Sequence, residues 1–158
     1  MRMAGCALKG RSGHKVGRWL LSELYRQETG ESMPEIAIAK GGKPYFKDSP
    51  YYFSITHTNN HAFCALSSRP IGIDAEELDR RINLKLAEKV LSPGEYAQYL
   101  ASENKERTLL TFWVLKEAQV KLTGEGLRGY PNHTDFTLPH PAVREIDGCL
   151  LAILKEKD

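Results

Sequence analysis

Two acidic side chains two positions apart, Asp74 and Glu76, are the strongest sign of chemistry in this sequence. In "IGIDAEE" they alternate with Ile73 and Ala75. Successive side chains of a strand point to opposite faces, so both carboxylates are expected on the same face of one strand. A solvated strand face is the ordinary meaning of such a pair. The alternative is part of a divalent-cation site, because magnesium prefers oxygen ligands and is held by a few carboxylates together with water and phosphate.

A third carboxylate lies in a segment with helical spacing. In "FWVLKEAQVKL", Trp113, Glu117 and Lys121 are four residues apart and share one stripe of a helix, with Lys116 beside them. One interpretation is a surface ion pair between Glu117 and Lys121, worth about 0.3 kcal/mol, behind a core tryptophan. The other is a metal and phosphate site, in which Glu117 holds the cation and the lysine ammonium groups neutralise phosphate oxygens.

Hydroxyl, imidazole and ammonium groups precede the acidic pair. Thr56, His57 and Thr58 lie where an expected strand runs into a turn, a place where binding groups are often displayed. His57 is either an ordinary turn residue or a hydrogen-bonding partner of phosphate. Lys43 lies between two glycines and a proline, so a turn directs it and an extended segment follows. A modest basic cluster, in the simplest interpretation a solvated helix start, contains Arg11, Lys15 and Arg18.

The surrounding sequence predicts the elements that position these groups. Periodicity indicates a helix in residues 14–30, two short helices in 82–100, a long helix in 104–123, strands at 51–57, 61–67, 70–76 and 149–155, and a loop at 131–143. Gly30 and Gly124 are helix stops. Ser92, Pro93 and Glu95 together have the pattern of a capping box at a helix start.

This order of elements predicts a mixed α+β fold with small antiparallel sheets. The sequence has no regular strand–helix alternation and no glycine-rich phosphate loop. Its two parts resemble each other loosely, each with one long helix and a few strands, and no low-complexity linker separates them. A chain of 158 residues buries about 70% of its unfolded surface, so the two parts are expected to pack against each other.

Composition narrows the functional classes. The formal net charge is only +2, which argues against nucleic acid as the main partner. No segment is apolar and long enough for a signal peptide or a membrane span. Cys6, Cys64 and Cys149 form no CxxC pair, and the last two lie in apolar runs, as expected for buried thiols in a reducing compartment. We therefore expect a cytoplasmic protein that does not bind membranes.

Several of these segments, in this order, resemble the 4'-phosphopantetheinyl transferases of the surfactin-synthetase type. The similar segments are "VGRWLLSELYR", "GKPYF", "FSITHT", "GIDAE", "LSPGEYAQYL" and "FWVLKEAQVK". The resemblance spans roughly residues 10–127, and "GIDAE" with "FWVLKEAQVK" is its most specific part. Ser54 stands where the family commonly has asparagine, threonines replace two serines of the same segment, and Ala75 replaces a bulkier apolar residue.

The resemblance implies a reaction and a fold. The reaction transfers the 4'-phosphopantetheine group of coenzyme A to a serine of an apo acyl or peptidyl carrier protein and releases 3',5'-ADP. The fold consists of two similar halves related by a pseudo-twofold axis, each a small antiparallel sheet on a long helix, with coenzyme A between them. Here the halves correspond to residues 1–68, which is shorter than usual, and 69–158. A single chain of this kind is a pseudo-dimer and is expected to be a monomer.

The resemblance also implies roles for the residues singled out above. The expected ligands of magnesium, with manganese as an alternative, are Asp74, Glu76 and Glu117. Glu117 is the expected acceptor of the serine proton, and the expected contacts of the coenzyme A pyrophosphate are Lys121 and Lys116. The expected contacts of the rest of coenzyme A are Thr56 and His57 at the phosphorylated ribose, Lys43 near the nucleotide, and Lys15 and Arg18 at the 3'-phosphate. Glu95 is expected to support the metal or the base.

Two alternatives to the transferase remain open. One is a truncated, non-catalytic relative that binds carrier protein or coenzyme A, although an intact set of charges argues against a decayed site. The other is a magnesium-dependent phosphoesterase or nuclease, which the weak net charge does not favour. Carrier proteins are typically acidic around the modified serine, and Lys85, Lys89 and Leu91 are candidates to meet them. An ordinary amphipathic helix explains these three residues equally well.

Overall fold

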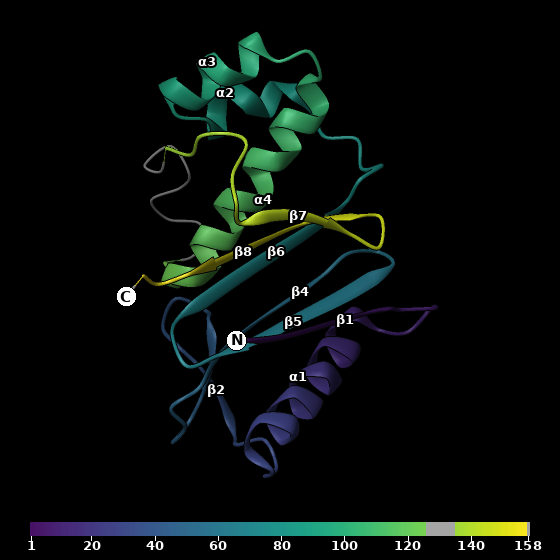
Figure 1. The fold of residues 1–158 in the computed structure, drawn as a ribbon, viewed down its shortest axis with the longest axis vertical. Helices are drawn as coiled ribbons and strands as arrows, with labels where there is room; N and C mark the ends of the chain where they lie inside the picture. The colour runs from purple at the N-terminus through teal and green to yellow at the C-terminus, as the bar shows by residue number, and fades with distance from the viewer. Residues whose placement is uncertain (126–134, 158) are drawn as a thin grey trace.

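Two three-stranded antiparallel sheets, each packed against one long helix, form the framework of the structure (Figure 1). It is a computed structural model in which residues 1–125 and 135–157 are described. The first sheet and its helix occupy the lower part of Figure 1, and the second sheet with the remaining helices occupies the upper part. This arrangement confirms the predicted α+β class.

The first sheet has the strand order β1-β5-β4, built from β1 (Arg2–Ala7), β4 (Tyr52–His57) and β5 (His61–Ser67). Helix α1 (Gly13–Thr29) packs against it and contributes Leu20, Leu21 and Leu24 to a shared core. The helix ends at Gly30, whose φ of 76° is left-handed, as expected for a glycine stop. Leu20 is buried in this core, whereas its neighbour Trp19 is exposed.

A small two-stranded sheet lies beside this unit, formed by β2 (Ile36–Ile38) and β3 (Pro44–Phe46). The extended segment expected after Lys43 is therefore confirmed. Strands β1 and β2 were not predicted. Their sequences, "RMAGCA" and "IAI", are mostly half-buried, so neither shows the strict apolar alternation that marks a strand with one buried face.

The second sheet has the order β6-β8-β7, from β6 (Ile71–Glu77), β7 (Val143–Ile146) and β8 (Cys149–Lys155). Helix α4 (Lys105–Thr123) packs on β6 and β8 and ends at Gly124 in the left-handed region, as predicted. Strand β7 was not predicted, and it begins where the expected loop at 131–143 ends. Residues 135–142 form no helix or strand, and 131–134 lie outside the described residues.

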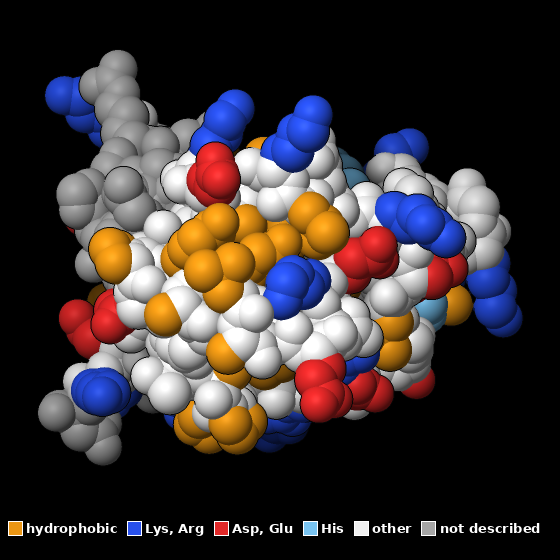
Figure 2. Space-filling view, turned by 90° about the horizontal axis from the view of Figure 1, so that it is seen from above, with side chains coloured by type: hydrophobic (Ala, Val, Ile, Leu, Met, Phe, Trp, Pro, Cys, Tyr) orange, Lys and Arg blue, Asp and Glu red, His pale blue; other side chains and the backbone are white. Residues whose placement is uncertain are grey.

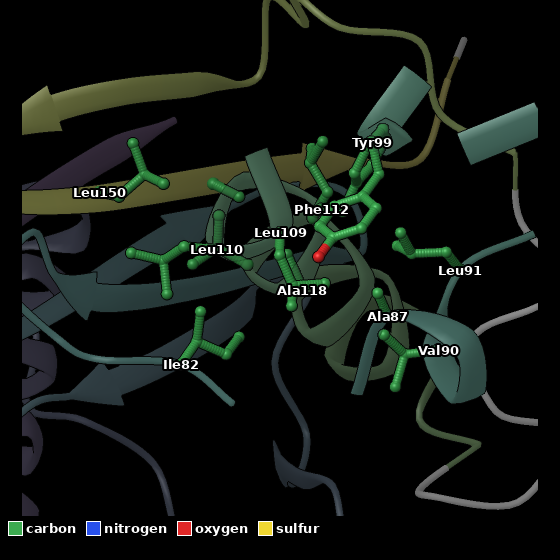
Figure 3. Close-up of a cluster of buried hydrophobic side chains, with 13 residues drawn as sticks. Ile82, Ala87, Val90, Leu91, Tyr99, Leu109, Leu110, Phe112, Ala118 and Leu150 are labelled. Carbon is green, nitrogen blue, oxygen red and sulfur yellow. The ribbon is translucent and has the colours of Figure 1, made fainter. Parts of the chain in front are cut away.

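A cap of short helices covers the far side of α4: η1 (Leu84–Leu86), α2 (Ala87–Val90) and α3 (Pro93–Ala101). The predicted capping box is present, because Ser92 accepts a hydrogen bond from the Glu95 backbone and the Glu95 side chain accepts one from the Ser92 backbone. Tyr99 of α3 joins Leu109 and Phe112 of α4 in the largest apolar cluster (Figure 3). The cluster also contains Leu150 and Ala152, so it packs α4 against both the short helices and β8.

The two units share one topology. In each, a strand is followed by the long helix and then by two further strands, and the last strand lies between the other two. The change from one sheet to the other falls between Ser67 and Ile71. We call the parts before and after this point the first and second half. Their exact bounds at 1–68 and 69–158, and a pseudo-twofold axis between them, stay predictions.

The halves meet along β4 and β6 (Figure 1). The backbone N–H of Ile73 donates to Ser54 Oγ at 3.0 Å, so the serine of "FSITHT" joins the two strands. On the other side of β6, Gly72 allows α4 to approach closely. A Cβ atom at Gly72 would lie 2.2 Å from the carbonyl oxygen of Ala118 and 2.3 Å from the backbone nitrogen of Leu122. The glycine of "GIDAE" is therefore required by the packing of α4.

Candidate functional site

Strand β6 presents its two acids as the alternation predicts. Ile71, Ile73 and Ala75 are buried in a core cluster with residues of β5 and β8. Asp74 and Glu76 leave the opposite face of the strand, toward α4 and β4. Contacts with these two elements rule out the simple solvated strand face.

Asp74 is 7% exposed and lies between the two halves. Its Oδ1 accepts hydrogen bonds from Lys121 Nζ at 3.0 Å and from Thr56 Oγ1 at 3.3 Å. Its Oδ2 is buried and has no hydrogen-bond partner among residues 1–125 and 135–157. Burial raises the pKa of Asp74 to about 6, Lys121 opposes that rise, and the charges of Glu117 and Glu76 add to it. A buried carboxylate oxygen without a partner, with two further carboxylates nearby, is a place where a cation fits.

Glu76 is partly buried and forms an ion pair with Arg80. Burial raises the pKa of Glu76. The charge of Arg80 and hydrogen bonds from Trp113 and Arg80 oppose this rise, whereas the charge of Glu117 adds to it. The Arg80 guanidinium also lies 5.8 Å from the centre of the Trp113 ring. Trp113 is thus half-buried at the edge of the site rather than enclosed in the core. The charge of Glu117 raises the pKa of both Asp74 and Glu76, so the three predicted carboxylates lie near one another.

Two predicted site residues are buried and form an ion pair with each other. Lys116 is 1% exposed and its Nζ lies 2.6 Å from Oε1 of Glu95, which is fully buried. Glu95 also accepts hydrogen bonds from the backbone N–H groups of Ser92 and Phe136. Lys116 is enclosed because α3 covers the face of α4 from which it points. That Lys116 meets pyrophosphate and that Glu95 supports a metal or a base stay predictions, which this enclosed pair does not favour.

Lys43 and Lys121 line one cavity of about 260 Å³ between the halves. The Lys43 ammonium donates to the backbone carbonyls of Leu122 at 3.0 Å and of Ile71 at 3.3 Å, and burial lowers its pKa. The cavity is also lined by the turn before β3, by β4 and by the end of α4, through Gly41, Gly42, Pro44, Phe53, Ser54, Ile55, Val120 and Gly124. Groups from both halves are therefore directed into one space.

The predicted phosphate contacts of the first half gather at the start of α1. A Cβ atom at Gly13 would lie 2.5 Å from the His57 ring, so the imidazole packs against the first turn of this helix. Lys15 is exposed in the same turn, where its backbone N–H donates to Ser12 at the N-cap, and half-buried Arg18 follows one turn later. Thr56 does not join them, because its hydroxyl donates to Asp74. A helix start with an imidazole and two cations is suited to binding an anion.

The expected carrier-protein contacts lie at the end of the molecule formed by α2 and α3. Figure 2 looks onto this end and shows apolar side chains gathered among lysine, arginine and acidic side chains. Lys85 and Lys89 are exposed there. Leu91 is 6% exposed and meets the surface only in a depression that is lined by Glu88, Leu91, Pro93 and Tyr96.

One cluster of chemically active side chains was not predicted. His61, Glu77 and Cys149 place possible metal-ligand atoms within 4.8 Å of one another. Burial, together with Glu77, raises the pKa of Cys149 to about 12, so the sulfur is a protonated thiol and not a nucleophile. These residues are far apart in sequence and have no motif spacing. The pairing of Glu77 with Cys149 across β6 and β8 and the packing of β5 against β6 bring them together.

The part of the chain that matches a known protein family contains β6 and α4, the elements that carry the three acids. Residues 70–154, from β6 to β8, match the model of the 4'-phosphopantetheinyl transferase superfamily. The chain is 38% identical over 118 residues to 4'-phosphopantetheinyl transferase Sfp of Bacillus subtilis, an alignment that covers 73% of this chain and 51% of Sfp. It is 37% identical over 94 residues to HetI of Nostoc sp., covering 54% and 40%. It is 32% identical over 118 residues to AcpT of Escherichia coli K12, covering 71% and 60%.

The matched region includes Asp74, Glu76, Glu117 and Lys121 as well as the glycine that α4 packs on. The chain spans about half the length of Sfp and of the similar enzyme psf-1 of Bacillus pumilus. The family model nevertheless covers more than half of this chain and nearly all of the second sheet. The chain belongs to the 4'-phosphopantetheinyl transferase superfamily, and its relatives are of the Sfp type.

Proposed function

We propose that this chain transfers the 4'-phosphopantetheine group of coenzyme A to a serine of an apo acyl or peptidyl carrier protein, with release of 3',5'-ADP. The observation that carries the proposal is the grouping of Asp74, Glu76 and Glu117 beside Lys121 at the contact between the halves. Relatives that carry the name 4'-phosphopantetheinyl transferase align over most of this chain and support the reaction class.

The carboxylate site fits a magnesium or manganese ion. Asp74 Oδ2 is buried and meets no hydrogen-bond partner in the described part of the chain, and the mutual repulsion of three carboxylates contributes to the raised pKa of Asp74. Asp74, Glu76 and Glu117 would hold the ion, which would neutralise the charge that develops on the pyrophosphate. In the structure, Lys121 and Arg80 provide the positive charge at two of these acids. With Asp74, Glu76 and Glu117 holding such an ion, the Lys121 ammonium would be available to phosphate oxygens.

The side chains then have separate tasks in the transfer. The serine oxygen forms a bond to the phosphorus that bears the pantetheine arm, and the bond from that phosphorus to the departing 3',5'-ADP breaks. Glu117 takes the serine proton, and the Lys121 ammonium stabilises charge on the pyrophosphate. Such reactions depend mainly on positioning and charge neutralisation, which this arrangement of fixed charges supplies.

The cavity between the halves is the proposed place of coenzyme A. Lys43 lies at its wall, held by carbonyls of Ile71 and Leu122, so it is in place before a nucleotide arrives. At the start of α1, His57, Lys15 and Arg18 would bind the 3'-phosphate and its ribose. Coenzyme A bound in this way would contact residues of both 1–68 and 69–158, which is the reason to treat these as two halves of one site.

The cellular setting and assembly are proposals of the same kind. Cys6, Cys64 and Cys149 are free, which is suited to a reducing, cytoplasmic compartment. The two similar halves already supply the cleft that two subunits would otherwise form, so we propose a monomer. Among the described residues, no helix is both long enough and apolar enough to cross a membrane.

The test is the intact mass of an apo carrier protein after incubation with this chain, coenzyme A and magnesium. We expect the carrier to gain one phosphopantetheine. The gain should disappear with EDTA and with Asp74→Ala, and it should persist with Glu31→Ala, which removes an exposed acid just beyond α1. Glu117→Gln should also abolish it, and near-normal turnover of that variant at saturating magnesium would remove Glu117 as the proton acceptor.

The same experiment separates the alternatives. If no carrier gains mass while coenzyme A still binds, the chain is a binding-only relative. If magnesium alone allows hydrolysis of a generic phosphodiester, the chain is a phosphoesterase. Because several carrier types are tried together, failure with one carrier is not mistaken for lack of activity.

A further inference from the structure

A mixed nitrogen, oxygen and sulfur cluster lies at the far end of the contact between the halves. His61 begins β5, Glu77 ends β6 and Cys149 begins β8. Glu77 and Cys149 are directly opposite each other in the second sheet, whereas His61 reaches them from the first sheet. Three strands from two sheets therefore converge on one point.

Two separations within this cluster are close to the edges of a tetrahedral zinc site. His61 Nδ1 lies 3.1 Å from Glu77 Oε1 and 3.5 Å from Cys149 Sγ, and Cys149 Sγ lies 3.5 Å from the other carboxylate oxygen, Glu77 Oε2. From zinc bond lengths of about 2.1 Å to nitrogen or oxygen and about 2.3 Å to sulfur, tetrahedral geometry gives about 3.4 Å between nitrogen and oxygen and about 3.6 Å from sulfur to either. The two separations from His61 Nδ1 are within a few tenths of an ångström of these values, and one ligand atom from each of the three residues lies within 4.8 Å of the other two.

The surroundings are also those of a ligand set. Cys149 is completely buried, and His61 and Glu77 are mostly buried. The Thr58 hydroxyl donates to Glu77 Oε1 and so orients the carboxylate, which is the usual role of a group behind a metal ligand. Glu77 also lines a cavity of about 500 Å³, so a fourth position would remain open to water on that side.

We propose that His61, Glu77 and Cys149 bind a transition-metal ion of the zinc class, separate from the carboxylate site at Asp74. Imidazole, thiolate and carboxylate suit zinc, whereas magnesium takes oxygen ligands, so the two sites select different metals. Binding exchanges the thiol proton of Cys149 for the metal and releases the proton to solvent. Without metal, the same atoms share hydrogen bonds. With it, the ion joins β5 of the first half to β6 and β8 of the second.

Cobalt is the probe that tests this site without any measurement of transfer activity. The full-length chain is stripped with EDTA, freed of EDTA and titrated with Co²⁺ in a thiol-free buffer. We expect a thiolate-to-cobalt charge-transfer absorption in the near ultraviolet and tetrahedral d–d bands in the visible, at one ion per chain. Zn²⁺ should displace the signal, and Mg²⁺ should not.

Variants locate the ion. Cys149→Ala should remove the thiolate band, whereas Cys6→Ala, which removes another free cysteine, should keep it. Asp74→Asn should keep it as well, because the carboxylate site is separate. His61→Gln retains the buried cysteine, so it tests the site even if Cys149→Ala folds poorly. Its cobalt affinity should fall by more than the roughly 10- to 100-fold expected for Thr58→Val, which changes only a group behind a ligand.

Two results overturn the proposal. One is a folded wild-type chain that shows no thiolate band at saturating cobalt, which would make the cluster a hydrogen-bonded contact only. The other is a band that survives both Cys149→Ala and His61→Gln, which would place the metal at another cysteine. Neither result bears on the transfer reaction, which does not use these three residues.

Discussion

The two halves share a topology but carry different charged side chains on their matching elements. In each, a strand, a long helix and two strands form a sheet with the last strand in the middle. In the second half, β6 and α4 present Asp74, Glu76 and Glu117. In the first half, β1 has no acidic side chain, and α1 offers Lys15 and Arg18 instead. Topology therefore fixes where a site forms, and the residues on matching elements decide what each half contributes.

The halves also differ in buried charge. Asp74, Glu95 and Lys116 are the charged side chains that are buried in the described part of the chain, and all belong to the second half. Glu95 and Lys116 neutralise each other, whereas Asp74 has one oxygen without a hydrogen-bond partner among the described residues. The ion pair is part of the core, whereas the burial of Asp74 costs free energy that the proposed bound cation would offset. Substitutions that remove the charge of Lys116 or of Asp74 distinguish the role of the ion pair from that of the buried carboxylate.

The largest effect is expected from breaking the buried ion pair. Lys116→Met leaves Glu95 buried without its cation and should lower the free energy of unfolding by about 3–5 kcal/mol, measured by urea denaturation. The double variant Lys116→Met/Glu95→Leu should recover most of this loss, because it removes both charges. Arg107→Met, which breaks the surface pair with Glu145, should cost at most about 1 kcal/mol. A small effect of Lys116→Met would show that the pair is not needed by the core.

The next effect concerns pH and Asp74. Its pKa is about 6 in the folded chain and 3.8 in the unfolded chain, so between these values the folded chain binds more protons. In EDTA, the free energy of unfolding should therefore fall as pH rises from 3.8 to about 6, by about 3 kcal/mol at most.

Asp74→Asn should remove this slope and make the metal-free chain more stable at pH 7, although it abolishes transfer. Denaturation curves across this pH range, with and without magnesium, provide the measurement. Magnesium should stabilise the wild type and leave the variant unchanged. If the free energy of unfolding of Asp74→Asn depended on pH as that of the wild type does, a group other than Asp74 would be responsible for the dependence.

Alanine substitutions at one glycine in each half compare how tightly the two halves are packed. At Gly72 a Cβ would meet backbone atoms of Ala118 and Leu122, which cannot move without α4, so Gly72→Ala should cost about 1–3 kcal/mol. At Gly17 of α1 it would meet only the Ile55 side chain, at 2.5 Å. Ile55 can rotate and alanine favours a helix, so Gly17→Ala should cost less. Thermal unfolding of both variants tests this order, and equal losses would contradict it.

The smallest effect is expected at the start of α1. Lys15→Ala and Arg18→Ala should each raise KM for coenzyme A by about two- to fivefold with little change in kcat, because a cation there contributes up to about 1 kcal/mol of binding. The increase should shrink at high salt. Arg26→Ala, in the last turn of the same helix, is the matched control and should leave KM unchanged. A fall in kcat instead would assign these cations to the reaction step.

Sequence alone was sufficient wherever the signal is local. Alternation in "IGIDAEE" predicted β6 and the common face of Asp74 and Glu76, and Ser92 with Gly30 and Gly124 marked helix ends that the structure confirms. Such features depend on backbone geometry and on hydrogen bonds between residues a few positions apart. They are therefore present in any fold that contains the segment. Half-buried strands such as β1 and β7 lack a clear alternation, and sequence did not reveal them.

Tertiary structure alone decided which side chains of one helix reach the site. Lys116 and Lys121 are five positions apart on α4, yet one is enclosed with Glu95 and the other donates to Asp74. The spacing of residues along α4 does not predict which of its faces α3 will cover. In the same way, Asp74 is buried because β4 lies across it, and His61 meets Glu77 and Cys149 because two sheets end at one point. Burial and long-range contacts arise from packing between elements, which a single sequence does not encode locally.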